Sequence, residues 1–310
     1  MTRIYFATDI HGSEKCWKKV LNAGKFYEAN VTIIGGDLTG KAIVPIVEAP
    51  GGAKASFRGK DYILDSDEKT REFEEIISMS GYYPYHLSPK EHDEMRADSS
   101  KLDLLFAQLM KERLCRWVKL ADDKLGKTNT KFYVCPGNDD PLEISDILKE
   151  SSTVIDVSDR VVPLDDNHMM INVGWSNSTP WKTHRECSEE ELAKRIEDQV
   201  SQLNDVQNSV FQLHVPPYAS QLDDAPKLDA TLKIVYGETA AVGSTAVRST
   251  IEKHQPLLGL HGHIHESSGV QKIGRTLCVN PGSAYTEGIL NGVVLFLDKS
   301  KIKSYYSVVG

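Results

Sequence analysis

The sequence predicts an α/β fold in which parallel strands end in polar loops. Its opening reads as a strand, a helix at about 13–24 and a second strand, which is a βαβ unit. Five short apolar runs, each typical of a buried strand, end in a polar or glycine-rich turn. The five runs are 4–7, 31–34, 132–135, 210–213 and 256–260.

Side chains of the kinds that bind metals follow these five runs. The carboxyl ends of parallel strands meet at one edge of a sheet, where α/β proteins bind ligands. Buried acidic groups at such an edge are costly unless they are neutralised, and a pair of divalent cations would neutralise them. We therefore expect a metal centre formed by Asp9, His11, Asp37, Asn138, His214, His263 and His265.

The composition limits the class of protein. The chain has 310 residues, of which 40% are hydrophobic and 26% charged, as in an ordinary globular protein with a sizeable core. The formal net charge of -8 disfavours nucleic-acid binding over a broad basic surface. The five cysteines occur singly, which favours free thiols in a reducing compartment. The first strand begins beside Met1 and no apolar run is long enough to span a membrane, so we expect a cytoplasmic protein.

The segment between Asp37 and Asn138 is too long for a plain crossover and must contain structure of its own. Residues 81–86, which include three tyrosines, are expected to form a rigid loop within it. Both ends of the segment join candidate ligand loops, so it would leave from and return to the metal-binding edge. We interpret 1–310 as one domain with a cap-like insertion at about 41–129.

Apolar periodicity predicts the remaining elements. Helices are expected at about 68–79, 100–124 and 141–149, from 188 to about 203, and at 244–253. Strands are expected at 153–156, 160–163 and 168–173, in a hairpin at 55–64, and in a meander-like C-terminal region containing 269–273, 276–279, 292–297 and 301–309.

In their order along the chain, the five ligand motifs resemble those of the calcineurin-like metallophosphoesterase family. The family pattern is D-x-H, G-D, G-N-H-[DE], a single H, and G-H-x-H. The resemblance covers about residues 3–40, 130–141 and 208–285. Each motif alone is weak, but five in the same order are a specific signal. The resemblance implies an α/β/β/α sandwich of two mixed sheets flanked by helices.

The resemblance also implies how two metals share the ligands. One metal would be held by Asp9, His11 and His265. The other would be held by Asn138, His214 and His263, and Asp37 would bridge the two. Imidazole, carboxylate and amide groups suit Mn, Fe, Zn or Ni without strong selection, and we favour Mn. Two such ions can share a bridging hydroxide, lower the pKa of that water and hold phosphoryl oxygens during in-line attack.

One position departs from the family motif. Asp139 stands where the family commonly has a His that donates to a phosphate or leaving oxygen, and it is our candidate catalytic residue. An ionised carboxylate would repel a dianionic monoester more than a monoanionic diester. Asn177 and Arg185 are candidate substrate contacts because Arg pairs well with phosphate, with a purely structural surface loop as the alternative.

The expected function is therefore that of a metal-dependent phosphoesterase, a hydrolase that favours phosphodiesters. A phosphomonoesterase or nucleotide pyrophosphatase with the same metals is the alternative. A non-catalytic interaction module is disfavoured because all seven ligands are present, and a nuclease is disfavoured by the acidic balance. The expected partner is a small phosphorylated substrate, with nucleotides among the candidates, and the sequence leaves the oligomeric state open.

Overall fold

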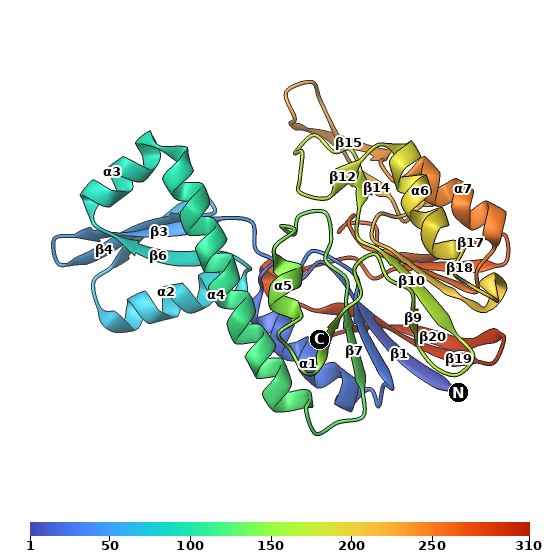
Figure 1. The fold of residues 1–310 in the computed structure, drawn as a ribbon. Helices are drawn as coiled ribbons and strands as arrows, with labels where there is room; N and C mark the ends of the chain where they lie inside the picture. Colours follow the sequence, from blue (N-terminus) through green and yellow to red (C-terminus); the bar gives the residue numbers. More distant parts are fainter.

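A computed structural model describes residues 1–310 and contains two six-stranded mixed sheets (Figure 1). The strand order of the first sheet is β20 (Lys301–Val309), β19 (Asn291–Asp298), β1 (Thr2–Ala7), β2 (Val31–Ile34), β7 (Lys131–Val134) and β8 (Val154–Asp156). The order of the second is β17 (Gly269–Ile273), β18 (Thr276–Asn280), β16 (Leu258–Leu260), β13 (Val210–Leu213), β10 (Met169–Val173) and β9 (Val162–Pro163). Four neighbouring strands in each sheet are parallel.

Helices cover the outer faces of both sheets. The first sheet packs against α1 (Glu14–Phe26), α4 (Ser99–Leu125) and α5 (Ile144–Leu148), and the second against α6 (Glu189–Val200) and α7 (Thr245–His254). A separate apolar cluster lies between the sheets and contains residues from both. The burial of three successive cores produces four layers. The expected α/β/β/α sandwich is confirmed.

The helices begin where the sequence supplies a capping side chain. The hydroxyl of Ser13 accepts a hydrogen bond from the backbone N–H of Cys16 at the start of α1. Ser188 accepts one from the N–H of Glu191 at the start of α6. Such bonds satisfy N–H groups that lack partners within the helix. They fix the first turns of two helices that cover opposite faces of the sandwich.

The insertion contains its own four-stranded sheet, in the order β5-β4-β3-β6. A small apolar core joins this sheet to α2, and the subregion projects from one side of the sandwich (Figure 1). The expected hairpin and first helix are present, together with a short helix that the sequence analysis did not identify. In chain order the elements are β3 (Ile43–Ala49), β4 (Gly52–Phe57), β5 (Lys60–Leu64), α2 (Asp67–Met79), β6 (Tyr83–Leu87) and α3 (Pro89–Ala97).

The expected rigid loop at 81–86 is wrong, because most of it is strand β6, which pairs in parallel with β3. Pro84 weighed against a strand, since proline lacks the N–H that a central strand would use. β6 lies at the edge of its sheet and tolerates this loss. The insertion is therefore a small α/β unit.

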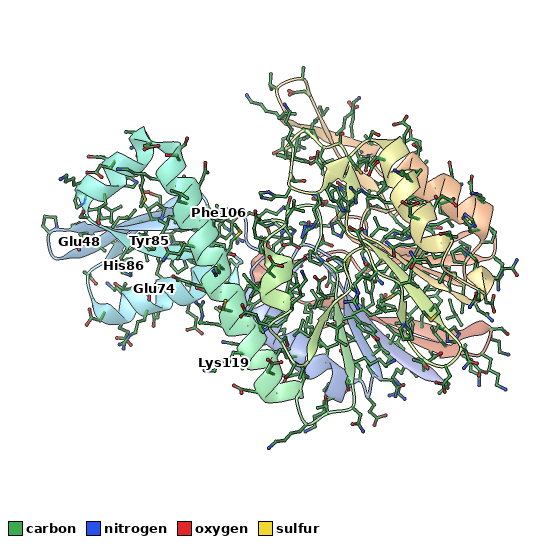
Figure 2. The ribbon with its side chains drawn as sticks, viewed as in Figure 1. Glu48, Glu74, Tyr85, His86, Phe106 and Lys119 are labelled. Carbon is green, nitrogen blue, oxygen red and sulfur yellow. The ribbon has the colours of Figure 1, made fainter.

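Helix α4 connects the insertion to the sandwich. Phe106, near its start, packs edge-on against Tyr83 of the insertion, with ring centroids 5.6 Å apart. Trp117, a further three turns along, stacks on Trp17 of α1 at 4.8 Å. Figure 2 shows Phe106 on the half of α4 nearest the insertion and Lys119 on the other half. The second half of α4 thus packs in the sandwich core, although it falls within the insertion predicted at about 41–129.

The C-terminal region does not form one meander. Strands β17 and β18 join the second sheet, whereas β19 and β20 join the first. The connection after β18 crosses between the sheets and includes a short 3-10 helix, η2 (Tyr285–Glu287). The remaining elements are β11 (Ser176–Asn177), β12 (Glu186–Cys187), η1 (Val206–Asn208), β14 (Asp224–Leu228) and β15 (Ile234–Ala241). No helix combines the length and apolar character needed to cross a membrane.

Candidate metal centre

All five candidate ligand loops follow parallel strands, as expected, but the strands belong to both sheets. β1, β2 and β7 of the first sheet precede three of the loops, and β13 and β16 of the second precede the other two. Backbone hydrogen bonds tie the loops together. The N–H of His11 donates to the carbonyl of Asp37 at 2.9 Å, and that of Gly262 donates to the carbonyl of His214 at 2.8 Å. The site therefore lies where the two sheets meet.

The first group of ligand-type atoms belongs to Asp9, His11 and His265, and these atoms all lie within 4.8 Å of one another. The Nε2 atoms of the two histidines are 3.0 Å apart, and Oδ1 of Asp9 is 3.5 Å from Nε2 of His265. Two facing imidazole nitrogens need at least one proton or cation between them. This arrangement fits a shared metal ion.

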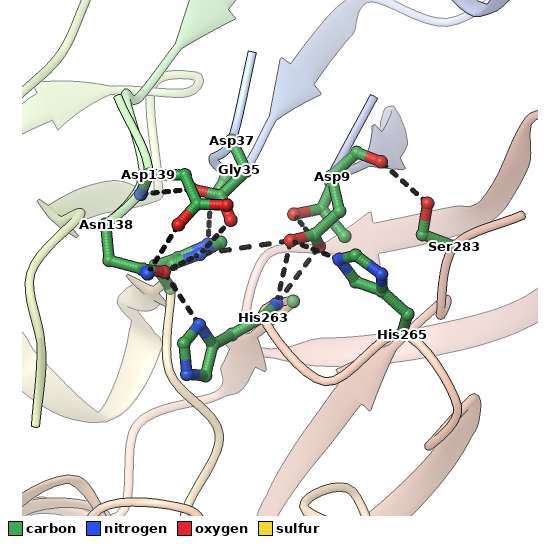
Figure 3. A network of polar contacts seen from close by, with 12 residues as sticks. Asp9, Gly35, Asp37, Asn138, Asp139, His263, His265 and Ser283 are labelled. Atoms are coloured by element: carbon green, nitrogen blue, oxygen red, sulfur yellow. Dashed lines mark hydrogen bonds and ion pairs between the residues drawn. The ribbon is translucent and has the colours of Figure 1, made fainter. Parts of the chain in front are cut away.

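The second group belongs to Asp37, His214 and His263, again within 4.8 Å of one another. The amide oxygen of Asn138 lies 3.1 Å from Nε2 of His214 and 2.7 Å from Nδ1 of His263 (Figure 3). Oδ2 of Asp37 is 3.4 Å from Nε2 of His214 and 3.6 Å from Nε2 of His11. Asp37 thus lies between the two groups, and all seven expected side chains are brought together.

His214 shows why this site suits a cation. Its Nδ1 faces the carbonyl of Gly35 at 2.9 Å, and a carbonyl can only accept, so Nδ1 carries a proton. Nε2 of a neutral His214 then points its lone pair at the oxygen of Asn138. Burial alone would lower the pKa of His214, but the Asp37 carboxylate outweighs burial and raises this pKa to about 9. In the absence of a metal, a proton supplies the positive charge that the site attracts.

The electrostatics of the other ligands agree with this interpretation. Burial, followed by the charge of Lys41, lowers the pKa of His11, and burial together with the charge of His214 lowers that of His263 to about 4. Both rings are therefore neutral near pH 7, which is the form that binds metals. Burial would raise the pKa of Asp9, but the hydrogen bond from His265 and nearby positive charges lower it. His11 and His263 thus present neutral imidazoles beside an ionised carboxylate, whereas nearby carboxylates raise the pKa of His214 and His265.

Four of the seven side chains sit on left-handed backbone. The φ angles are 51° at Asp9, 38° at His11, 50° at Asp37 and 68° at His263. Non-glycine residues rarely adopt this region, and such strain persists only where the surroundings impose it. Gly137 allows a related close approach, because a Cβ atom there would lie 2.2 Å from Oδ1 of Asp37. The loops are thus held in unfavourable conformations that bring the ligand atoms together.

Asp140 joins two of the ligand loops. Its fully buried carboxylate accepts hydrogen bonds from the N–H groups of Leu38, Thr39 and Gly137 at 2.8–3.0 Å. Its place just before the helix expected at 141–149 is compatible with a supporting role behind the ligands or with a helix N-cap. The N-cap interpretation is wrong because α5 begins at Ile144. Asp140 instead fixes the Asp37 loop against the Asn138 loop.

Arg185 and Asn177 lie near the same region with their donors bonded to the protein. The buried guanidinium of Arg185 donates to the carbonyls of Asp140 and Pro141 at 3.2 and 3.1 Å, and so braces the loop that follows Asn138. Asn177 donates to the carbonyl of Val242 at 3.4 Å. These contacts favour the structural alternative for both residues. Their contact with a substrate stays a prediction.

Asp139 lies at the rim of the site, with its backbone N–H donating to Oδ1 of Asp37 at 3.0 Å. Its Oδ2 is 3.7 Å from Nδ1 of His11 and 3.0 Å from Nζ of Lys41. Sequence reasoning missed Lys41, which follows G-D-L-T-G without a distinguishing motif. The carboxylate that we expected to repel a dianion is therefore paired with an ammonium group.

Two other residues at the site were also missed as participants. The hydroxyl of Ser283 donates to the carbonyl of Asp9 at 2.6 Å (Figure 3), and the ring of Tyr285 packs against His11 with centroids 4.7 Å apart. Ser283 lies within residues 280–284, which the sequence predicts to be a scaffold turn, and Tyr285 follows that turn directly. That interpretation is consistent with Asn280, whose amide donates to the carbonyls of Gly262 and Ile264. The turn supports the two ligands of the last motif.

Comparisons with known proteins agree with the fold. No family model matches the sequence. MJ1162, an uncharacterized protein of Methanocaldococcus jannaschii, is 33% identical over 148 residues, which cover 47% of this chain and only 61% of that protein's length. One solved structure is 14% identical and covers 97% of both chains with a TM-score of 0.56. The protein TT1561 of Thermus thermophilus is 13% identical and covers 94% of this chain and 93% of its own, with a TM-score of 0.51.

Structural similarity at this level of identity establishes the fold. The chain shares its α/β/β/α fold with these two solved structures, and its five ordered motifs resemble those of the calcineurin-like metallophosphoesterases. The site that the fold assembles contains His and Asp clusters suited to divalent metal ions.

Proposed function

We propose that this protein is a dinuclear-metal-dependent phosphohydrolase that favours phosphodiesters. The observation that carries the proposal is the convergence of two ligand groups with Asp37 between them. Asp9, His11 and His265 would hold one metal, and Asn138, His214 and His263 the other. Such a pair supplies Lewis acidity, a water of lowered pKa and a clamp for phosphoryl oxygens. Imidazole and oxygen ligands suit Mn, which we favour, as well as Fe, Zn or Ni.

The protein orients these ligands before any substrate binds. The carbonyl of Gly35 fixes the ring of His214 so that Nε2 faces the site. The N–H of His263 and the hydroxyl of Thr8 donate to the carboxylate of Asp9, and the N–H of Asp139 donates to that of Asp37. Partners of this kind fix the orientation of metal ligands and tune their basicity. The residues thus supply positioning, and a substrate would approach where the site reaches the surface, beside the partly exposed side chains of Asp139 and His265.

A phosphomonoesterase or nucleotide pyrophosphatase with the same metals remains the second candidate. The pairing of Lys41 with Asp139 favours it, because the ammonium offsets the repulsion that the carboxylate would exert on a dianion. The proposed preference for diesters then depends on how much of the repulsion between the Asp139 carboxylate and a dianionic phosphate remains. Matched mono- and diesters distinguish the two candidates.

The first test is metal analysis of the purified protein followed by assays on aryl monoesters, aryl diesters and nucleotides with Mn²⁺. We expect two metal ions per chain, hydrolysis that stops when a chelator removes them, and faster turnover of diesters than of matched monoesters. Protein that is fully loaded with metal yet hydrolyses no ester would instead support a non-catalytic module. Faster monoester turnover would support the second candidate.

We also propose that the insertion acts as a cap that shapes access to the site. Arg113 of α4 donates to the carbonyls of Gly12 and Tyr82, which ties the insertion to the residue after His11. Arg58 at the β4–β5 turn donates to the carbonyl of Thr286, beside the ring that packs on His11. The insertion thus contacts the sandwich at two places near His11, one at Gly12 and the other at Thr286.

Replacing residues 43–97 with a short linker, while α4 is kept, is expected to preserve metal content and to change the ratio of monoester to diester turnover. The metal ligands lie outside this segment, whereas part of the rim is lost with it. Metal analysis and thermal melting establish that the shortened protein is folded, and the ester panel then measures the ratio. If the folded, metal-loaded protein keeps the native ratio of monoester to diester turnover, the insertion does not act as a cap.

A further inference from the structure

We propose that Lys41 binds the phosphoryl group of the substrate and that Asp139 positions it. Asp139 stands where the motif of the family that this chain resembles commonly has a His, so the pair would occupy that place. The proposal rests on the proposed function and assigns a substrate-binding residue to the same site. In this role Asp139 positions Lys41 and does not need to donate a proton.

The geometry places Lys41 at the rim of the candidate metal centre. Its Nζ lies 3.0 Å from Oδ2 of Asp139, and Asp139 follows Asn138 directly in the chain. Figure 3 shows Asp139 beside Asn138 and Asp37. The Lys41 side chain is 43% exposed and that of Asp139 20%, so both side chains reach the surface of the site. A phosphate between the metals and the surface would pass within reach of it.

The ammonium group has unused hydrogen-bonding capacity. A lysine offers three N–H donors, and Asp139 is the partner that the protein supplies to Nζ of Lys41. Donors therefore remain for a phosphoryl oxygen. Among the lysines and arginines, Lys41 alone forms an ion pair with one of the three aspartates of the site, Asp9, Asp37 and Asp139. A single mobile point charge of this kind is a common phosphate contact in proteins.

The backbone beside Lys41 is held tightly, which argues against a merely solvated lysine. A Cβ atom at Gly40 would lie 2.1 Å from the carbonyl oxygen of Gly81, so that this approach requires glycine. The N–H of Gly40 also donates to the hydroxyl of Tyr83 at 3.0 Å. Half-exposed ion pairs contribute little to stability. The chain thus fixes the base of Lys41, while the side chain stays partly exposed beside the site.

Lys41→Met is expected to lower kcat/KM for the preferred ester by about 10- to 100-fold, the usual effect of losing a charge-assisted hydrogen bond. It should weaken binding of inorganic phosphate to the metal-loaded protein by a similar factor, measured by calorimetry. Metal content should not change. Lys41→Arg should restore much of both properties because it keeps the charge. Lys90→Met, at a lysine 86% exposed on α3, is the matched control and should behave like the native protein.

The role of Asp139 is tested by Asp139→Asn, which keeps the shape and removes the charge. We expect a smaller loss of phosphate affinity than in Lys41→Met. Adding Asp139→Asn to Lys41→Met should cause no further loss, because Asp139 acts only by positioning Lys41. Additive losses in the double variant would show that Asp139 does not act through Lys41.

The outcomes separate this inference from the proposed function. If the native, metal-loaded protein hydrolyses no ester, the proposed function fails, and phosphate binding still decides whether Lys41 is an anion contact. If the native protein is active and Lys41→Met leaves both kcat/KM and phosphate affinity unchanged, Lys41 is not a substrate contact. If Lys41→Met loses metal, the lysine acts on the metal centre, and the inference is likewise overturned.

Discussion

Asp37→Asn is expected to abolish ester hydrolysis and to leave at most one metal ion per chain. Oδ2 of Asp37 lies between Nε2 of His11 and Nε2 of His214, at 3.6 and 3.4 Å, and its other oxygen accepts from the N–H of Asp139. A neutral amide keeps the volume but bridges two cations poorly. Because metal catalysis contributes several kcal/mol to such reactions, we expect activity to fall by at least about 1,000-fold.

Metal content by elemental analysis and turnover of the best ester measure this effect, and thermal melting of the metal-free protein shows whether the fold survives. Asp166→Asn, at an exposed aspartate remote from the ligand loops in sequence, is the control and should retain both metals. An Asp37→Asn protein with native metal content and rate would show that Asp37 does not bridge two ions.

All seven candidate ligands could be proposed from the sequence because each follows a strand whose apolar pattern is visible locally, and the structure brings their side chains close together. The motifs after β1 and β2 lie in the first sheet, and those after β13 and β16 in the second. Local patterns do not show that the two sheets converge at the ligand loops. The resemblance to a known family supplied that step, and the left-handed backbone at Asp9 and Asp37 became visible only in the structure.

The residues that support the ligands could not be assigned from the sequence. Asp140 was compatible with a helix cap or a supporting role, and only its bonds to Leu38 and Thr39, far away in the chain, decide between them. The guanidinium of Arg185 suits a phosphate and backbone carbonyls equally well, so its placement against the carbonyl of Asp140 had no local signal. Lys41 meets Asp139 across the whole insertion.

Strands were missed where pairing partners and prolines obscured the pattern. β3 and β6 pair with each other across two other strands and a helix, and each contains a proline. β14 and β15 form a hairpin of largely exposed residues that lacks the buried apolar run used to recognise strands. Both cases follow from burial and tertiary pairing, which override local propensity in sheets.

His265→Ala is expected to empty one of the two metal sites, whereas His254→Ala is expected to leave both filled. The pair is closely matched, because the two side chains are 22% and 17% exposed and each lies near a carboxylate. Nε2 of His265 faces Nε2 of His11 at 3.0 Å and Oδ1 of Asp9 at 3.5 Å. Nε2 of His254 instead meets Glu197 at 2.8 Å at the end of α7, remote from every ligand loop.

The two variants therefore separate metal binding from the general cost of removing a histidine. Loss of the contact between His254 and Glu197 should cost at most about 1 kcal/mol of stability and no activity. Loss of His265 removes an imidazole ligand and leaves the carboxylate of Asp9 with fewer partners, so metal affinity and turnover should fall together, by more than the roughly 10- to 100-fold typical of supporting residues. Metal content by elemental analysis at a fixed Mn²⁺ concentration gives the comparison. Equal effects from the two substitutions would contradict the ligand assignment as a whole, because only one of these histidines contacts the proposed centre.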